Sequence, residues 1–178
     1  MNQTSLRTQK IAFLALLLAL IFVLMLVERM LPPLPFLPPN MNIGLSNVVI
    51  MFSLFFVGKR ECFTLVVLKA LFNVMMRGPI AGLLSLSGGL LSVLVIIFFV
   101  WLFKDKISYV ALGIVGAIAH NVGQLLIFCF LMQSWLLFLY FSPVLLVSGS
   151  ILGTLTGILL KVALPALQKA QIKFNNNN

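Results

Sequence analysis

The sequence predicts an all-α integral membrane protein with about six transmembrane helices. The 178 residues are 62% hydrophobic, only 8% are charged, and the mean hydropathy is +1.18. Too few polar side chains are therefore available to hydrate the surface of a soluble domain. Several apolar segments approach or exceed the roughly 20 residues with which a helix crosses the hydrocarbon core. None of them shows the sustained alternation of polar and apolar residues that marks a membrane β-barrel.

The first expected span, residues 11–31, follows Arg7 and Lys10 and resembles a signal peptide at its start. It is too long for a signal peptide and no small-residue cleavage site follows it, so we expect a retained helix. The second and third spans, 43–57 and 62–76, have about 15 residues each and need flanking residues to cross the full bilayer. The remaining spans are expected at 80–103, 109–132 and 141–164.

Three parts follow from these boundaries. Residues 1–10 are expected to form a cytoplasmic segment, 11–164 a single six-helix membrane domain and 165–178 a cytoplasmic tail. The tail ends in a run of asparagines that we expect to be disordered.

The distribution of lysine and arginine predicts the orientation. If both termini are cytoplasmic, nine basic residues lie on the cytoplasmic side, Arg29 and Arg77 lie near the outer face, and Lys69 lies within a span. This asymmetry satisfies the positive-inside rule. Because the basic residues are scattered singly, the net charge of +9 does not indicate a nucleic-acid surface. The nine are Arg7, Lys10, Lys59, Arg60, Lys104, Lys106, Lys161, Lys169 and Lys173.

The first outer connection, residues 32–42, is rich in proline. It holds five prolines between Pro32 and Pro39, which favours an extended, stiff segment over a helix. The segment is either a rigid linker or an apolar lid over a pocket that opens outward.

Small residues recur at helix-packing spacing on three of the spans. Such stripes let helix backbones approach closely in lipid, and packing inside the bundle is their ordinary use. The stripe on the first span could instead dock a partner protein. The stripes are Ala12, Ala15 and Ala19; Ala81, Ser85 and Gly89; and Gly149, Gly153 and Gly157.

The sequence offers little for catalysis. Glu28, Glu61 and Asp105 lie near the ends of different spans, with Glu28 on the opposite side from the other two, so no carboxylate pair or Asp-cradled magnesium is expected. No phosphate-binding GxxxxGK[ST] loop occurs. Cys62 and Cys129 lack metal-ligand spacing, and a disulfide between them is not expected. We expect no catalytic residue, no metal and no cofactor, and a protein that is not an enzyme by itself.

Polar residues interrupt the third span. Lys69, Asn73 and Arg77 are four residues apart and share one helix face that climbs from mid-membrane to the outer surface. A lysine at the helix centre costs about 2.5 to 3.5 kcal/mol on insertion scales and usually faces the bundle interior or a cavity. Alternatively, Lys69 snorkels inward and Arg77 anchors the outer interface.

A second polar edge interrupts the fifth span. His120, Asn121 and Gln124 cover about one helical turn in apolar surroundings and are either structural hydrogen-bonding groups or part of a site. Asn42, Ser46 and Asn47 could add a third polar wall.

These groups outline an outward-facing site with two fixed cations, and we expect no acid to face them. Uncompensated cations favour an anionic ligand such as a phosphate, a diphosphate or a carboxylate, while the apolar helices suit an amphipathic body. The expected substrate-binding residues are Asn47, Lys69, Asn73, Arg77, His120, Asn121 and Gln124.

Four segments within residues 42–160 can be compared with known families: "NIGLSNVVIMFSLFFVGKRECFTLVVLKALFN", "LLSLSGGLLSVLVI", "GAIAHNVGQLLI" and "LYFSPVLLVSGSILGTLTGILL". In this order they resemble the bacterial membrane family labelled Gx transporter or heptaprenyl diphosphate synthase component I. That family is similar to the substrate-binding S components of energy-coupling factor (ECF) transporters. The resemblance implies six helices, cytoplasmic termini and an outward pocket. It also implies docking onto a transmembrane coupling protein powered by two ATPases, with Ala12, Ala15 and Ala19 in the docking position.

Two functions follow as hypotheses. The first is an S subunit of an ECF-type ABC importer in the bacterial cytoplasmic membrane, which captures a small anionic or amphipathic metabolite such as a vitamin, a flavin or an isoprenoid-like molecule. The second is a non-catalytic accessory protein of isoprenoid or quinone (heptaprenyl diphosphate) metabolism. If the chain is instead a purely structural subunit, changes at the polar face should alter stability alone.

Overall fold

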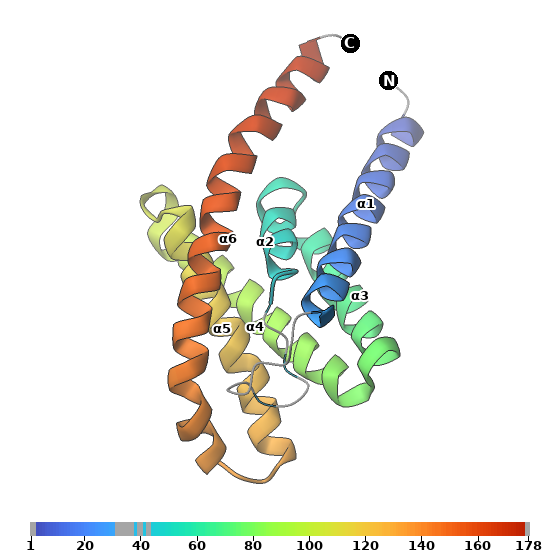
Figure 1. The fold of residues 1–178 in the computed structure, drawn as a ribbon. Coiled ribbons are helices and arrows are strands. Elements are labelled where there is room, and N and C mark those ends of the chain that lie inside the picture. The colour runs from blue at the N-terminus through green and yellow to red at the C-terminus, as the bar shows by residue number, and fades with distance from the viewer. Residues whose placement is uncertain (1–2, 31–37, 39–40, 42–43, 177–178) are drawn as a thin grey trace.

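The computed structural model describes residues 3–30, 38, 41 and 44–176, and the side chains of 8–30, 38, 41, 44–104 and 106–162. Six α-helices account for nearly all of these residues (Figure 1), which confirms the predicted all-α class. The helices are α1 (Gln3–Met30), α2 (Asn47–Phe56), α3 (Lys59–Arg77), α4 (Pro79–Phe103), α5 (Tyr109–Leu131) and α6 (Leu136–Asn176), with a 3₁₀ turn η1 (Lys104–Lys106) after α4.

Four of the helices are long and apolar enough to cross a membrane: Thr8–Met30 within α1, all of α4 and α5, and Leu136–Val162 within α6. α2 has 10 residues, and at 1.5 Å per residue it reaches about half of the roughly 30 Å hydrocarbon core. α3 has 19 residues and is long enough, but it carries several charged residues. The chain is therefore a multi-pass membrane protein.

Local sequence explains most helix boundaries. Gly78 has a φ of +92° between α3 and α4, a conformation that glycine adopts at no steric cost, and Pro79 opens α4 at a position where proline is favoured. Ser108 caps α5 by accepting a hydrogen bond from the Ala111 N–H. α6 departs from the expectation, because it begins at Leu136 and continues to Asn176 through most of the expected tail.

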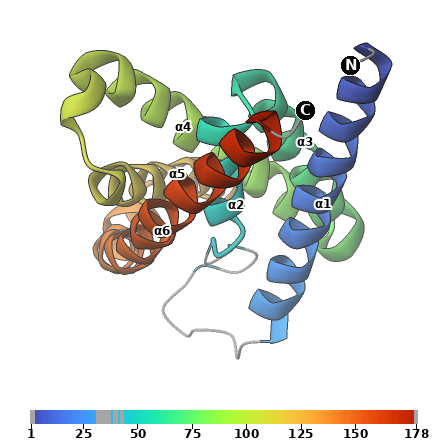
Figure 2. The same cartoon turned by 90° about the horizontal axis from the view of Figure 1, so that it is seen from above.

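The two chain ends lie at the same end of the bundle (Figure 1). α5 packs against both α4 and α6, α3 packs against α4, and α1 contacts α2 and α3 at one edge. Seen from above, α1 stands apart from α4, α5 and α6 (Figure 2). A stacked pair, Phe22 and Phe72, whose ring centroids are 3.9 Å apart, and an ion pair between Lys10 and Glu61 attach α1 to α3.

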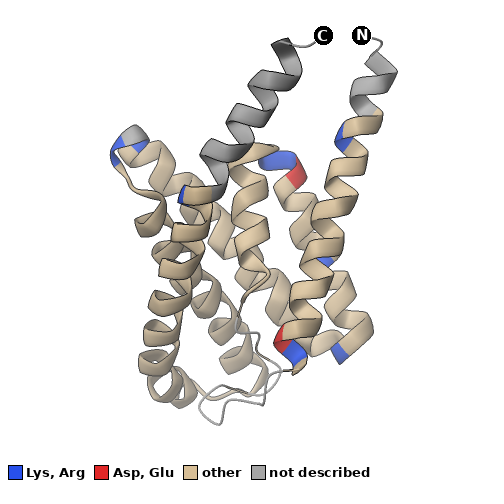
Figure 3. Cartoon of the chain, turned by 45° about the horizontal axis from the view of Figure 1, so that its top comes forward, with Lys and Arg blue, Asp and Glu red and all other residues tan. Residues whose placement is uncertain are grey.

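Charged residues gather at the two ends of the bundle (Figure 3). Lysine and arginine lie both toward the end that carries the termini and toward the opposite end. Arg29 and Arg77 are in the last turns of α1 and α3. Exposed tryptophans also occur near both ends, with Trp101 in the last turn of α4 and Trp135 before α6. Tryptophan is enriched at both membrane interfaces, so the long axis of the bundle runs across the membrane.

The small-residue stripes on α4 and α6 pack inside the bundle, as expected. A Cβ atom on Gly153 would lie 2.6 Å from the Gly113 carbonyl oxygen of α5, and a Cβ on Gly89 would lie 2.7 Å from Val66 of α3. The α1 stripe differs, because Ala12, Ala15 and Ala19 are all exposed. This stripe does not serve packing within the described part of the chain.

Candidate functional site

Lys69 lies inside the bundle. Its side chain is 1% exposed, and Nζ donates a hydrogen bond of 2.6 Å to Oδ1 of Asn47, the first residue of α2. A hydrogen bond to a charged group is about twice as strong as one between neutral groups. The ammonium group therefore ends at a part-buried partner and does not snorkel to a membrane surface.

An acid accompanies this lysine. Glu28, in the last turn of α1, accepts a hydrogen bond of 2.8 Å from the Gly44 N–H and interacts electrostatically with Lys69. The expectation that no acid faces the polar residues was wrong. Glu28 lies at the end of the first span, as expected, but only the packing of α1 against α2 and α3 brings its carboxylate to the start of α2.

The two charged residues hold the turn that leads into α2, residues 44–47. Glu28 binds the first residue of this turn and Lys69 binds the last. Gly44 and Ser46 of this turn are buried, and a buried backbone group that lacks a hydrogen bond costs several kcal/mol. Support of this turn is therefore one role of the pair.

His120 on α5 faces the same region. Its ring is fully buried. Nδ1 lies beside Gly88 of α4 but makes no hydrogen bond to it. Lys69 interacts with the ring electrostatically. A Cβ on Gly44 would lie 3.7 Å from the ring carbon Cδ2. His120 therefore lies against the α2 turn, and the charge of Lys69 acts on it.

The other polar residues of α5 diverge. Gln124 is fully buried and faces α4, since a Cβ on Gly88 would lie 2.8 Å from its Cγ. Asn121 faces α6 and donates a hydrogen bond of 2.9 Å from Nδ2 to the Leu145 carbonyl oxygen. Neighbouring residues point about 100° apart on a helix, so His120 and Asn121 face different helices.

Arg77 lies outside the buried polar group. The face that it shares with Lys69 and Asn73 is buried only as far as Asn73, which is 1% exposed, whereas Arg77 is exposed at the end of α3. Two serines are also fully buried: Ser46 in the α2 turn and Ser85 of α4, on the side of α4 where Gly82 and Gly89 approach Ala70 and Val66 of α3. Ser85 was predicted as a packing residue only, because a small residue in a stripe does not reveal whether its hydroxyl is buried without a partner.

We call these residues the polar cluster: Glu28, Ser46, Asn47, Lys69, Asn73, Ser85 and His120. Within the described chain, several of their buried polar atoms have no hydrogen-bond partner: Ser46 Oγ, Asn73 Nδ2, Ser85 Oγ and both ring nitrogens of His120. Most buried polar atoms in folded proteins are paired, so this concentration is unusual. Asn42 and nearly all of the proline-rich segment fall outside the described residues, although Pro38 and Met41 are described and buried.

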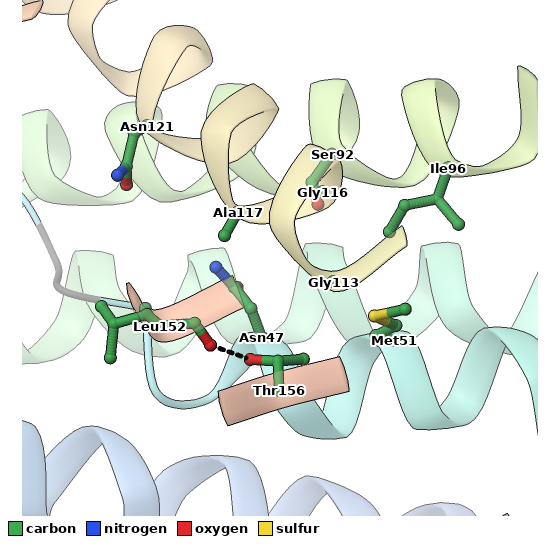
Figure 4. A pocket seen from close by; sticks show the side chains of 11 residues that line it. Asn47, Met51, Ser92, Ile96, Gly113, Gly116, Ala117, Asn121, Leu152 and Thr156 are labelled. Atoms are coloured by element: carbon green, nitrogen blue, oxygen red, sulfur yellow. Dashed lines mark hydrogen bonds between the residues drawn. The ribbon is translucent and has the colours of Figure 1, made fainter. Parts of the chain in front are cut away.

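A small cavity adjoins the polar cluster where α2, α4, α5 and α6 converge (Figure 4). Asn47 and Asn121 line it from α2 and α5, and Thr156 lines it from α6. Its volume of about 20 Å³ holds about one water molecule, far below the roughly 300 to 1,000 Å³ of a metabolite site. Entry of a metabolite here would require part of the bundle to move.

Replacing Glu28 by alanine is expected to loosen the α2 turn. Loss of a hydrogen bond to a charged acceptor, worth about 1.5 to 3 kcal/mol, should raise hydrogen exchange at the Gly44 amide by at least about tenfold. Glu28→Gln keeps an acceptor oxygen and should raise the exchange less. Glu61→Ala, at the opposite end of the bundle, is the control. Equal exchange in Glu28→Ala and wild type would show that this carboxylate does not hold the turn.

Comparison with known proteins gives two matches. A family model described as heptaprenyl diphosphate synthase component I matches residues 17–163. Among solved structures, the chain is similar to the S component of a bacterial ECF transporter, with 22% sequence identity and a TM-score of 0.55, over 94% of this chain and 98% of that chain. No curated protein matches the sequence. The family model therefore covers most of the chain, and the structural similarity covers nearly all of it.

Proposed function

Because the chain belongs to the heptaprenyl diphosphate synthase component I family and has the fold of an ECF S component, we propose that it is the membrane substrate-binding subunit of an ECF-type ABC importer. In this role it captures a small molecule from outside and is not itself an enzyme. A coupling protein and two ATPase subunits would supply the energy.

The observation that carries this proposal is the polar cluster. Support of the α2 turn explains Glu28, Asn47 and Lys69, but it leaves the unpartnered atoms of Ser46, Asn73, Ser85 and His120 without a role. These groups supply both donors and acceptors and come from the α2 turn and three different helices. Convergent polar groups in an apolar surround are typical of a small-molecule site, so we assign substrate binding to the polar cluster, with Asn121 and Gln124 beside it.

The charge balance refines the expected ligand. Lys69 favours an anion, but Glu28 lies close enough to offset part of its charge. A ligand therefore need not be strongly anionic to be stable here. Of the two expected classes, the anionic and the amphipathic, the presence of Glu28 favours the amphipathic one.

The proposed topology has six crossings with both termini in the cytoplasm of a bacterium. The basic residues at the end that carries the termini support this orientation by the positive-inside rule. α2, although short, is the second of these crossings. Residues 1–10 and 165–178 are then cytoplasmic, and the proline-rich loop 32–42 is on the outer side of the membrane.

The exposed alanines of α1 are the proposed docking surface. Ala12, Ala15 and Ala19 have no packing role in the described part of the chain, and small side chains allow a partner helix to approach closely. α1 also carries Glu28, so one helix connects the docking surface to the polar cluster.

Replacing Lys69 by methionine tests the proposal. The full chain is co-expressed with coupling and ATPase subunits, purified, and extracted, and the retained small molecules are measured by mass spectrometry. We expect Lys69→Met to lower retention of a specific molecule by at least about tenfold, since a charged hydrogen bond is worth about 1.5 to 3 kcal/mol. Arg77→Met removes a cation of the same helix that lies outside the polar cluster, and it should retain that molecule.

Thermal unfolding of each variant separates binding from folding. Retention that is unchanged in Lys69→Met, or lost only in proportion to folded protein, would contradict the proposal.

The family description also names a synthase component, which motivates the second candidate, a non-catalytic accessory role in heptaprenyl diphosphate metabolism. That role predicts a reconstituted synthase whose rate or product length depends on this chain. The fold similarity and the polar cluster support the transporter role instead.

A further inference from the structure

A second cavity lies between α5 and α6. Its volume is about 180 Å³, and its lining is almost wholly apolar, including Ile118, Val122 and Leu125 of α5 and Phe138 and Leu146 of α6. An engineered protein cavity of about 150 Å³ with a similar lining binds benzene. The space therefore suits an apolar group of about six carbon atoms.

This apolar cavity reaches the outer surface of the bundle. Leu146 is 45% exposed, and Val147 beside it is also exposed. In a membrane-spanning helix such apolar surface faces lipid. The cavity thus extends from the interface of α5 and α6 toward the hydrocarbon of the bilayer.

Asn121 connects this cavity to the polar side of the bundle. It lines both the apolar cavity and the small cavity beside Asn47. Its Nδ2 hydrogen bond to the Leu145 carbonyl oxygen lies between the two helices. A Cβ on Gly149 would lie 3.0 Å from that Nδ2, so a glycine at this position leaves room for the amide.

The two cavities and the polar cluster follow one another in space. Asn47 of the polar cluster lines the small cavity together with Asn121, and Asn121 lines the apolar cavity with Val122. Because His120, Asn121 and Val122 occupy a single turn of α5 and point to different sides of it, the three regions lie around α5 at nearly the same depth in the membrane. A molecule that meets both regions would extend sideways toward lipid, and not along the membrane normal.

We propose that the apolar cavity between α5 and α6 binds the apolar arm of the molecule whose polar end meets the polar cluster. This inference rests on the proposed function and narrows its substrate to an amphipathic molecule with an arm of about six carbons. In the bound molecule, the boundary between the polar end and the apolar arm lies beside Asn121. An acyl chain of a bilayer lipid is the competing occupant.

Filling the cavity tests this inference. The full chain is purified with its partner subunits, and the molecules extracted per mole of folded protein are measured by mass spectrometry. Val122→Phe from α5 and Leu146→Phe from α6 both place a ring in the cavity. Leu126→Phe and Val147→Phe are the matched controls, since both original residues are exposed and neither lines the cavity. Two cavity variants are used so that a folding defect in one leaves the test intact.

We expect one molecule whose amount falls at least about tenfold both in a folded cavity variant and in Lys69→Met. Its amount should not fall in the controls. The expected size follows because even one methylene in an apolar pocket changes affinity by about 10- to 200-fold. A molecule lost in Lys69→Met but retained in the folded cavity variants would overturn the inference and leave the proposed function standing. A molecule lost in the cavity variants but retained in Lys69→Met would identify a bilayer lipid and overturn the inference. If no molecule depends on Lys69, the proposed function fails, and the inference fails with it.

Discussion

Replacing Gly153 by leucine is expected to separate α5 from α6 and to destabilise the bundle by about 3 kcal/mol. A Cβ at this position would lie 2.6 Å from the Gly113 carbonyl oxygen and 2.7 Å from the Ile114 backbone nitrogen. Overpacking a well-packed core typically costs about 1 to 3 kcal/mol. Here the obstacle is backbone, which cannot rotate away as a side chain can, so the effect should lie at the upper end of that range.

The helix separation should also break the hydrogen bond between Asn121 and the Leu145 carbonyl oxygen. Thermal unfolding in detergent, followed with a thiol-reactive dye, measures the effect, because the free thiols of Cys62 and Cys129 are buried until the chain unfolds. Ala19→Leu adds a comparable side chain to an exposed position of α1 and should leave the unfolding temperature nearly unchanged. An equally small change in Gly153→Leu would show that α5 and α6 are not in backbone contact.

The second large effect is expected at the proposed docking surface. Replacing Ala15 by tryptophan should reduce recovery of the coupling protein and ATPases with the chain by at least about tenfold, since a bulky side chain prevents the close approach that alanine permits. Ala15 is exposed, so the isolated chain should fold normally. The readout is the molar ratio of subunits after affinity purification from membranes.

Leu20→Trp is the control for this prediction. Leu20 is also exposed, but it adjoins Ala19 and is therefore turned about 100° away from the alanine stripe. The control should recover the partner subunits like wild type. If Ala15→Trp recovers them equally well, the α1 stripe does not dock the coupling protein.

Helix positions were predictable because they depend on local sequence. Apolar runs set the helices, while Gly78 with Pro79 and the Ser108 cap set boundaries that agree with the sequence to within about a residue. The end of α6 was not predictable in this way. The terminal polar residues have no apolar pattern to indicate a helix, yet the helix continues through them to Asn176.

The polar cluster was only partly predictable. Lys69, Asn73 and His120 stand out because polar residues in apolar spans are rare, and all three are buried. Arg77 follows the same helical spacing as Lys69 but ends outside the bundle, and Asn121 points to α6 and away from His120. Spacing identifies a shared face on one helix, but it does not show how far along that face the neighbouring helices extend.

The sequence by itself determined the membrane class, the six helices and the polar residues that need an explanation, because hydropathy and helical period are properties of consecutive residues. The tertiary structure alone decided which of those polar residues meet. It brought Glu28 to Gly44 and Lys69 to Asn47, buried the stripes of α4 and α6, and left that of α1 exposed. The physical reason is that hydrogen bonds and close packing between helices depend on where the helices cross. Those crossing points are determined jointly by residues that are distant in the sequence.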